Sequence, residues 1–221
     1  MEPKEISTAI NTWTNNRSNA AAILQFLNQG YCFEISRVEF NKWQALTPEF
    51  IHAYPAVFKG ITKFVVIDNI TDQNTTIDYS NVFVKNYTYG SNVENGVDFG
   101  SGTSNSNISI IDALERIFRW LMNHNLWVRN QTTTAVGIFQ AFHIPFGDLE
   151  NLFHHSTSDT VYVLMGLMID ESTGEHIPEL ILWNETMNFV DPAMVADVAL
   201  PVPPFGIDNP VTNYQLLVQS V

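Results

Sequence analysis

A chain of 221 residues, 45% of them apolar, can bury enough surface to offset its conformational entropy, which excludes a disordered protein. Its 23 acidic and 10 basic residues give a net charge of −13. Such a surface repels phosphate backbones and anionic lipids, so we expect neither a nucleic acid nor a membrane among the partners of this protein.

The first part of the chain, residues 1–58, is predicted to be mainly helical. Apolar residues recur at helical spacing over residues 4–16. Asn19 can cap a second helix, which we expect to end before Gly30.

Two further helix signals follow in the same region. Ser36 opens a capping box, and Thr47 with Pro48 predicts a short helix that stops near Pro55. An alternative stays open for residues 31–40, which could instead pair as a strand.

The hydrophobic period changes after residue 58. Residues 63–67 have the pattern of a buried strand, and residues 82–89 alternate between apolar and polar types, with turn-forming residues between the two segments. Residues 90–107 are rich in Gly, Ser and Asn, which predicts a long flexible loop.

The strongest helix pattern in the chain covers about 109–124, with Ser109 as its cap. Its large apolar residues form one broad stripe: Ile110, Ile111, Leu114, Ile117, Phe118, Leu121 and Met122. We expect this stripe to face the core, because a helix usually buries its apolar side. Arg116 and Arg119 lie off the stripe and are expected on the solvated side.

Three apolar runs follow the helix, at 135–144, 161–169 and 180–183. The second is continuously apolar, which is typical of a central strand covered on both faces. Residues 170–176 then form the loop of a hairpin, and residues 146–155 form a short helix or turn. Half of the ten prolines fall between Pro192 and Pro210, so we expect an extended C-terminal arm over residues 191–221.

Together these patterns predict one α+β domain spanning residues 1–221. Its helical N-terminal region covers about 1–58, and residues 59–190 form a mixed or mainly antiparallel sheet packed on one long amphipathic helix. An extended, Pro-containing arm over residues 191–221 follows the sheet. One cysteine and an N-terminus without the features of a secretory signal lead us to expect a cytoplasmic protein. That cysteine, Cys32, lies between two aromatic residues, so we expect a buried, inert thiol.

The residues with the clearest chemical potential are histidines and carboxylates in the second half of the chain. Imidazoles and carboxylates are ligands that zinc and iron prefer, which makes a divalent transition-metal site a hypothesis. Its candidate ligands are His143, His154, His155 and Asp159, with Glu150 as a possible substitute for Asp159. Against it, no HExxH motif occurs, and adjacent histidines cannot easily aim at one ion from a regular element.

The charge distribution favours a different function. All ten Lys and Arg lie at or before Arg129, so residues 130–221 carry eleven acidic and no basic residues. We therefore expect a non-enzymatic protein-binding or assembly protein without a cofactor, whose main partner is protein, including a second copy of itself. The acidic surface, low in charge density, and the C-terminal arm would make the contacts. A metal-dependent hydrolase or oxygenase using residues 143–176 is the alternative, and an acidic toxin or immunity-like protein that masks a basic partner is a third reading.

Overall fold

The computed structural model describes residues 1–90, 108–154, 156–184, 195–202 and 210–220. The helices are α1 (Pro3–Asn16), α2 (Ala20–Leu27), α3 (Arg37–Gln44), α4 (Asn69–Asp72), α5 (Ile110–Gln131), α6 (Phe146–His154) and α7 (Gln215–Val218), with short 3-10 turns η1 (Tyr79–Asn81) and η3 (Val211–Asn213). The strands are β1 (Cys32–Ser36), β2 (Phe50–Phe58), β3 (Ile61–Asp68), β4 (Phe83–Asn86), β5 (Ala141–Pro145), β6 (Thr160–Ile169), β7 (His176–Asn184) and β8 (Val195–Val202).

The strands form one sheet in the order β1-β6-β7-β8-β5-β2-β3-β4, and every pair in it is antiparallel. The two outer strands approach each other through an isolated bridge between Cys32 and Thr88. The N–H of Thr88 donates to the carbonyl of Cys32 at 2.9 Å, and the N–H groups of Tyr31 and Cys32 donate to the carbonyl of Thr88. The sheet therefore curls until its two edges meet, which leaves an inner and an outer face.

The inner face holds the largest apolar cluster. Side chains alternate along each strand, so Phe33, Phe64 and Phe142 point to the same interior from β1, β3 and β5. One end of this interior is closed by α3 and α6, where Phe40 stacks on Phe153 with ring centroids 4.7 Å apart. The core therefore lies inside the curled sheet.

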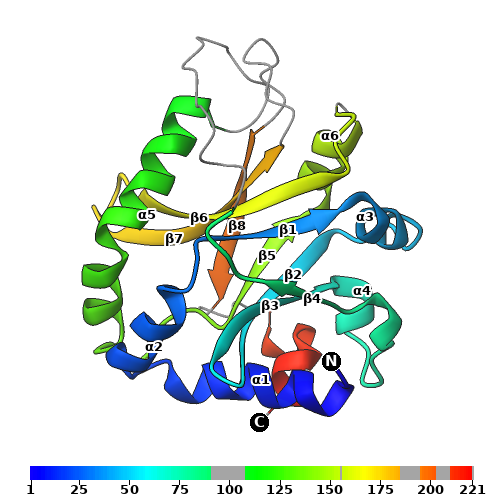
Figure 1. Cartoon of the computed structure of the whole chain (residues 1–221), viewed down its shortest axis with the longest axis horizontal. Helices are drawn as coiled ribbons and strands as arrows, with labels where there is room; N and C mark the ends of the chain where they lie inside the picture. The colour runs from blue at the N-terminus through cyan, green and yellow to red at the C-terminus, as the bar shows by residue number, and fades with distance from the viewer. Residues whose placement is uncertain (91–107, 155, 185–194, 203–209, 221) are drawn as a thin grey trace.

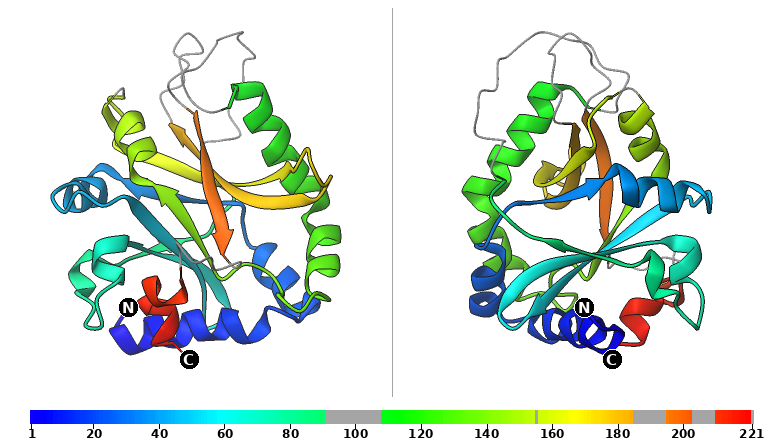
Figure 2. Two further views of the ribbon diagram at one scale, coloured as in Figure 1. Left: turned by 180° about the vertical axis from the view of Figure 1, so that it is seen from behind. Right: turned by 45° about the vertical axis from the view of Figure 1, so that its right-hand side comes forward.

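Helices cover the outer face on two sides, as Figures 1 and 2 show. The buried side of α1 packs with α7 against Tyr54 and Val65 of β2 and β3. On the other side, α5 packs Ala113 and Ile117 against β6 and β7. Between these helices, the candidate site lies on the outer face of β2 and β5.

The α+β class is confirmed, and several local signals are confirmed with it. Asn19 and Ser36 cap α2 and α3, with a reciprocal capping box at Ser36. Cys32–Ser36 takes the strand alternative. The hairpin of β6 and β7 closes around Gly174, whose φ of 72° suits a glycine in the turn.

Two predicted segments differ from the structure. The helix expected from Thr47 to Pro55 is strand β2, because seven consecutive residues within this strand are buried and hydrogen bonding to β3 outweighs the local signal of Pro48. In the C-terminal region, β8 is extended as expected and lies inside the sheet between β7 and β5, whereas Gln215–Val218 form the short helix α7, which packs against α1. The predicted loop at 90–107 lies, apart from residue 90, outside the described residues.

The helix expected at 109–124 is confirmed and runs on to Gln131, but it presents a different side to the core. Its buried residues are Ile110, Ala113, Ile117, Trp120, His124 and Val128. Arg116 and Arg119 face strands β6 and β7, where Arg116 pairs with Glu179 at 2.9 Å and Arg119 donates to the carbonyl of Leu167. Most of the predicted stripe is consequently exposed. In the parts of the chain that the structure describes, no helix is long and apolar enough to cross a membrane.

Candidate functional site

Two histidines meet on the outer face of the sheet. Strands β2 and β5 pair in a register that sets His52 directly opposite His143. Directly opposite residues of an antiparallel pair place their Cβ atoms about 4.5–5.5 Å apart on the same face. Two imidazoles that are 91 residues apart in sequence are thus brought side by side by the sheet alone.

The turn after β3 supplies a buried carboxylate to this pair. Asp68 ends β3 and caps α4 by accepting from the backbone N–H and the hydroxyl of Thr71, both at 2.7 Å. This single helical turn projects Asp72 back over the outer face of β2. Asp72 is fully buried.

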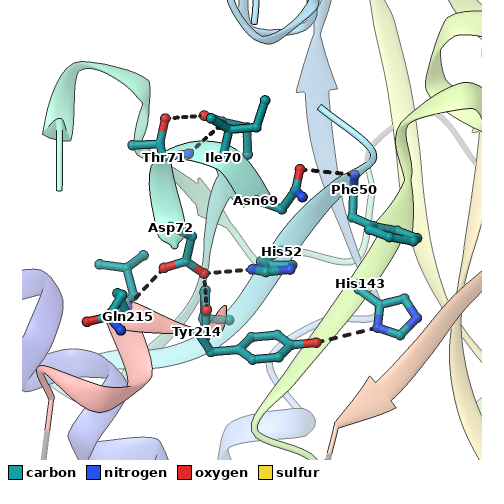
Figure 3. A network of polar contacts seen from close by, with 12 residues as sticks. Phe50, His52, Asn69, Ile70, Thr71, Asp72, His143, Tyr214 and Gln215 are labelled. Atoms are coloured by element: carbon teal, nitrogen blue, oxygen red, sulfur yellow. Dashed lines mark hydrogen bonds and ion pairs between the residues drawn. The ribbon is translucent and has the colours of Figure 1, made fainter. Parts of the chain in front are cut away.

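Asp72 accepts three hydrogen bonds, two from residues of β2 and one from the start of α7 (Figure 3). His52 Nδ1 lies 2.6 Å from Oδ2, the hydroxyl of Tyr54 donates to the same oxygen, and the N–H of Leu216 donates to Oδ1 at 2.9 Å. An ionised carboxylate only accepts hydrogen bonds, so it holds the His52 proton on Nδ1 and leaves Nε2 as the other ring nitrogen available for chemistry. Burial, followed by the charge of Asp72, raises the pKa of Tyr54 well above its usual value, which keeps this phenol a donor.

Tyr214, just before α7, covers the two histidines. Its ring stacks on the imidazole of His52 with centroids 4.3 Å apart and planes 20° from parallel. Its hydroxyl lies 3.5 Å from Nδ1 of His143, as Figure 3 shows. Burial, and to a smaller extent the nearby His52, lower the pKa of His143, so its imidazole is neutral at physiological pH.

These groups border a pocket of about 430 Å³. Its described lining residues are Glu49, Phe50, His52, Asn69, Gln73, His143, Asn213 and Tyr214. The side chain of Asn69 is positioned by the backbone at the start of β2, because its Oδ1 accepts from the N–H groups of Glu49 and Phe50 at 3.2 and 3.3 Å. Lys and Arg are absent from this lining, so Glu49 carries its one fixed charge among the described residues.

The predicted metal ligands are distributed over different places. His143 lies in the pocket. His154 ends α6 and is exposed, with its Nε2 3.4 Å from Nε2 of Gln44, and Asp159 is exposed and pairs with Arg37 at 3.4 Å. His155 lies outside the described residues. Within the described part of the chain, no three His, Cys, Asp or Glu side chains gather in a way that could hold a metal ion.

Cys32 behaves as the sequence predicts. It is fully buried, its Sγ lies 3.4 Å from the carbonyl of Thr88, and burial raises the pKa of its thiol to about 11. A thiol in this state is a poor nucleophile.

Sequence reasoning identified His143 but missed His52, Asp72 and Tyr214. His52 and Asp72 are twenty residues apart and match no motif, and residues 68–75 were interpreted only as a turn. The one available sequence signal was that His52 and His143 each lie next to apolar residues. That the two face one another depends on a strand pairing that the sequence does not display.

Comparisons with protein-family models, with curated proteins and with solved structures gave no match. Any function for this pocket must therefore be argued from its geometry.

Proposed function

We propose that the protein binds a small, uncharged hydroxycarbonyl compound in the pocket and transfers a proton at it, with His52 as the base. The observation that carries this proposal is the bond between His52 Nδ1 and the buried Asp72 at 2.6 Å. A carboxylate that fixes the tautomer and orientation of an imidazole makes the second nitrogen of that imidazole a better proton acceptor.

His143 supplies the complementary group. Its lowered pKa keeps it neutral, and a hydroxyl such as that of Tyr214 can donate to its Nδ1, which would leave the proton on Nε2. A neutral imidazole with a proton on Nε2 can donate to a carbonyl oxygen. A base beside such a donor is what proton abstraction next to a carbonyl requires: the C–H proton moves to Nε2 of His52 while the enolate oxygen is held by His143.

The lining of the pocket favours an uncharged ligand. Its volume of about 430 Å³ is in the usual range for small-molecule sites. The fixed negative charge of Glu49 disfavours phosphates and carboxylates, whereas the amide groups of Asn69, Gln73 and Asn213 can bond to hydroxyl groups. The half-buried ring of Phe50 gives one apolar wall.

Hydrogen–deuterium exchange at carbon tests the proposal directly. A panel of uncharged hydroxyketones and hydroxyaldehydes, including dihydroxyacetone and glycolaldehyde, is incubated with the protein in deuterated buffer, and loss of the C–H signals is followed by proton NMR. We expect exchange above the buffer rate for at least one compound at about 1 mM, the upper end of typical Michaelis constants. His52→Gln should slow this exchange at least about 100-fold, because general-base catalysis contributes about 10²–10⁴-fold.

The matched control is His176→Gln, since His176 is an exposed histidine at the start of β7 and does not line this pocket. It should exchange at the wild-type rate. The proposal is wrong if no compound exchanges faster than in buffer, or if His52→Gln and His176→Gln behave alike.

A further inference from the structure

Helix α5 has two apolar sides, and among the described residues only one of them is buried against the rest of the chain. The buried side packs on β6 and β7. The other side exposes five large apolar residues: Ile111, Phe118, Leu121, Met122 and Leu126. The exposed fractions of Phe118, Met122 and Leu126 are 63%, 63% and 62%.

These residues form one continuous surface. At 100° per residue, Phe118, Met122 and Leu126 follow one another along consecutive turns, and the half-buried Leu114 extends the row toward the start of the helix. We call this row, from Ile111 to Leu126, the outer stripe. In Figures 1 and 2 the outer side of α5 is not packed against any of the other labelled helices. Contiguous exposed apolar surface of this kind marks an interaction site more often than a free surface.

Charges at the two ends of the outer stripe specify the partner. Glu115 lies near the start of the stripe and Arg129 beyond its end, and both are exposed. The other two arginines of α5 point elsewhere, because Arg116 pairs with Glu179 and Arg119 bonds to Leu167. A second α5 running antiparallel would bring Arg129 of one copy toward Glu115 of the other, twice per pair. A parallel arrangement would instead put like charges together.

We propose that the outer stripe is a homodimer interface, in which two copies of α5 pack antiparallel around a two-fold axis near Trp120. In this register Leu114 lies opposite Leu126 and Phe118 opposite Met122, so the apolar residues of one copy meet those of the other. Arg129 then lies about one helical turn, roughly 6 Å along the axis, from Glu115 of the second copy, within reach of its long side chain. The antiparallel helix dipoles also favour this arrangement. The inference does not depend on the proposed pocket chemistry.

Sedimentation equilibrium of the full chain over the micromolar range measures the self-association. We expect a monomer–dimer equilibrium for the wild type and at least about a 100-fold weaker dimer for Phe118→Glu, since one buried aromatic anchor is lost in each copy and each loss should weaken the dimer about tenfold or more. The matched control is Val38→Glu, which places the same charge at an apolar side chain of α3 that is 69% exposed. Circular dichroism and chemical denaturation of both variants show that they remain folded.

A charge swap tests the antiparallel register. Glu115→Arg and Arg129→Glu should each weaken the dimer about fivefold, because two surface ion pairs are lost and like charges meet. The double variant should recover the wild-type dissociation constant. A wild type that stays monomeric at every concentration, as it would if another protein or another part of this chain covered the stripe, overturns the proposal. So does a Val38→Glu variant as weakened as Phe118→Glu, or a double variant no tighter than the single ones.

Discussion

At the scale of single residues, Asp72 has the largest structural role in the candidate site. Its two oxygens receive donors from β2 and from the C-terminal segment, so one side chain joins three parts of the chain. Asp72→Asn keeps the shape but turns one acceptor oxygen into a donor, which must then face another donor. We expect the free energy of unfolding in urea to fall by about 3 kcal/mol, as for a broken buried charged network.

Asp78→Asn is the control for this loss, because Asp78 is an exposed aspartate that bonds only within its own turn among the contacts described. Its effect should be much smaller than that of Asp72→Asn, as is usual for an exposed side chain. Equal losses for the two variants would mean that Asp72 does not hold the network together.

His143 should make stability depend on pH. Its pKa is lowered in the folded protein by burial and then by His52, whereas the unfolded chain has the ordinary value near 6.5. Below that value the unfolded chain binds a proton that the folded protein does not, so stability is lost as the pH falls from about 6.5 toward the lowered pKa. Denaturation at several pH values should show this loss, and His143→Gln should remove its share of the slope. An unchanged slope in the variant would contradict the prediction.

The metal site suggested by the sequence stays a prediction, because His155 is not described. Elemental analysis of protein purified without added metal tests it, together with the melting temperature after adding zinc, iron or manganese. A bound metal, or a rise in melting temperature on adding metal, that His154→Gln abolishes would support the sequence hypothesis. His154 is not among the partners of Asp72 in the described contacts, so this substitution should leave the candidate site undisturbed.

At the scale of elements, the meeting of the sheet edges depends on a glycine. A Cβ added at Gly30 would lie 2.6 Å from the backbone N and O of Thr88, closer than real Cβ contacts allow. Gly30→Ala should therefore push the two edges apart and lower the free energy of unfolding by about 1–3 kcal/mol. Chemical denaturation measures this.

Gly147→Ala provides the comparison. Gly147 lies in α6 with open space around the position of a Cβ, so alanine should stabilise the protein by about 0.5–1 kcal/mol through helix propensity. The prediction fails if Gly30→Ala is as well tolerated as Gly147→Ala.

Local sequence signals predicted those elements whose ends are determined by residues close to them in the sequence. The capping box at Ser36 is complete within four residues, so the sequence displays it in full. Strand β2 is different, because Pro55 lies within it opposite Phe64 of β3, and only the neighbouring strands show that this segment is extended. The site shares this dependence: His52 faces His143 because of a strand pairing that no local pattern reveals.

The orientation of α5 could not be predicted for another reason. Apolar residues occupy both its sides, so periodicity identifies the helix without deciding which side packs on the sheet. Two observations resolve it. Trp120 and Val128 are buried, and the long side chains of Arg116 and Arg119 bond to residues of β7 and β6.

At the scale of the whole molecule, the excess of carboxylates should govern solubility. The net charge of −13 at pH 7 opposes non-specific aggregation, and it vanishes near the isoelectric point of 4.6. We expect light scattering at low salt to rise sharply as the pH approaches that value and to reverse on return to pH 7. Scattering that is flat between pH 4 and 7 would contradict this expectation. The proposed dimers, whose contact is mainly apolar, should persist at pH 7.

The position of β8 has a consequence for biosynthesis. This strand lies between β7 and β5, and it joins the group β1-β6-β7 to the group β5-β2-β3-β4. On a ribosome, the strands of both groups emerge before residues 195–202, and until β8 follows, each group exposes an unpaired strand edge. Translation that stalls before β8 emerges should therefore yield products prone to aggregation, and chaperones that shield open strand edges should matter most in that interval.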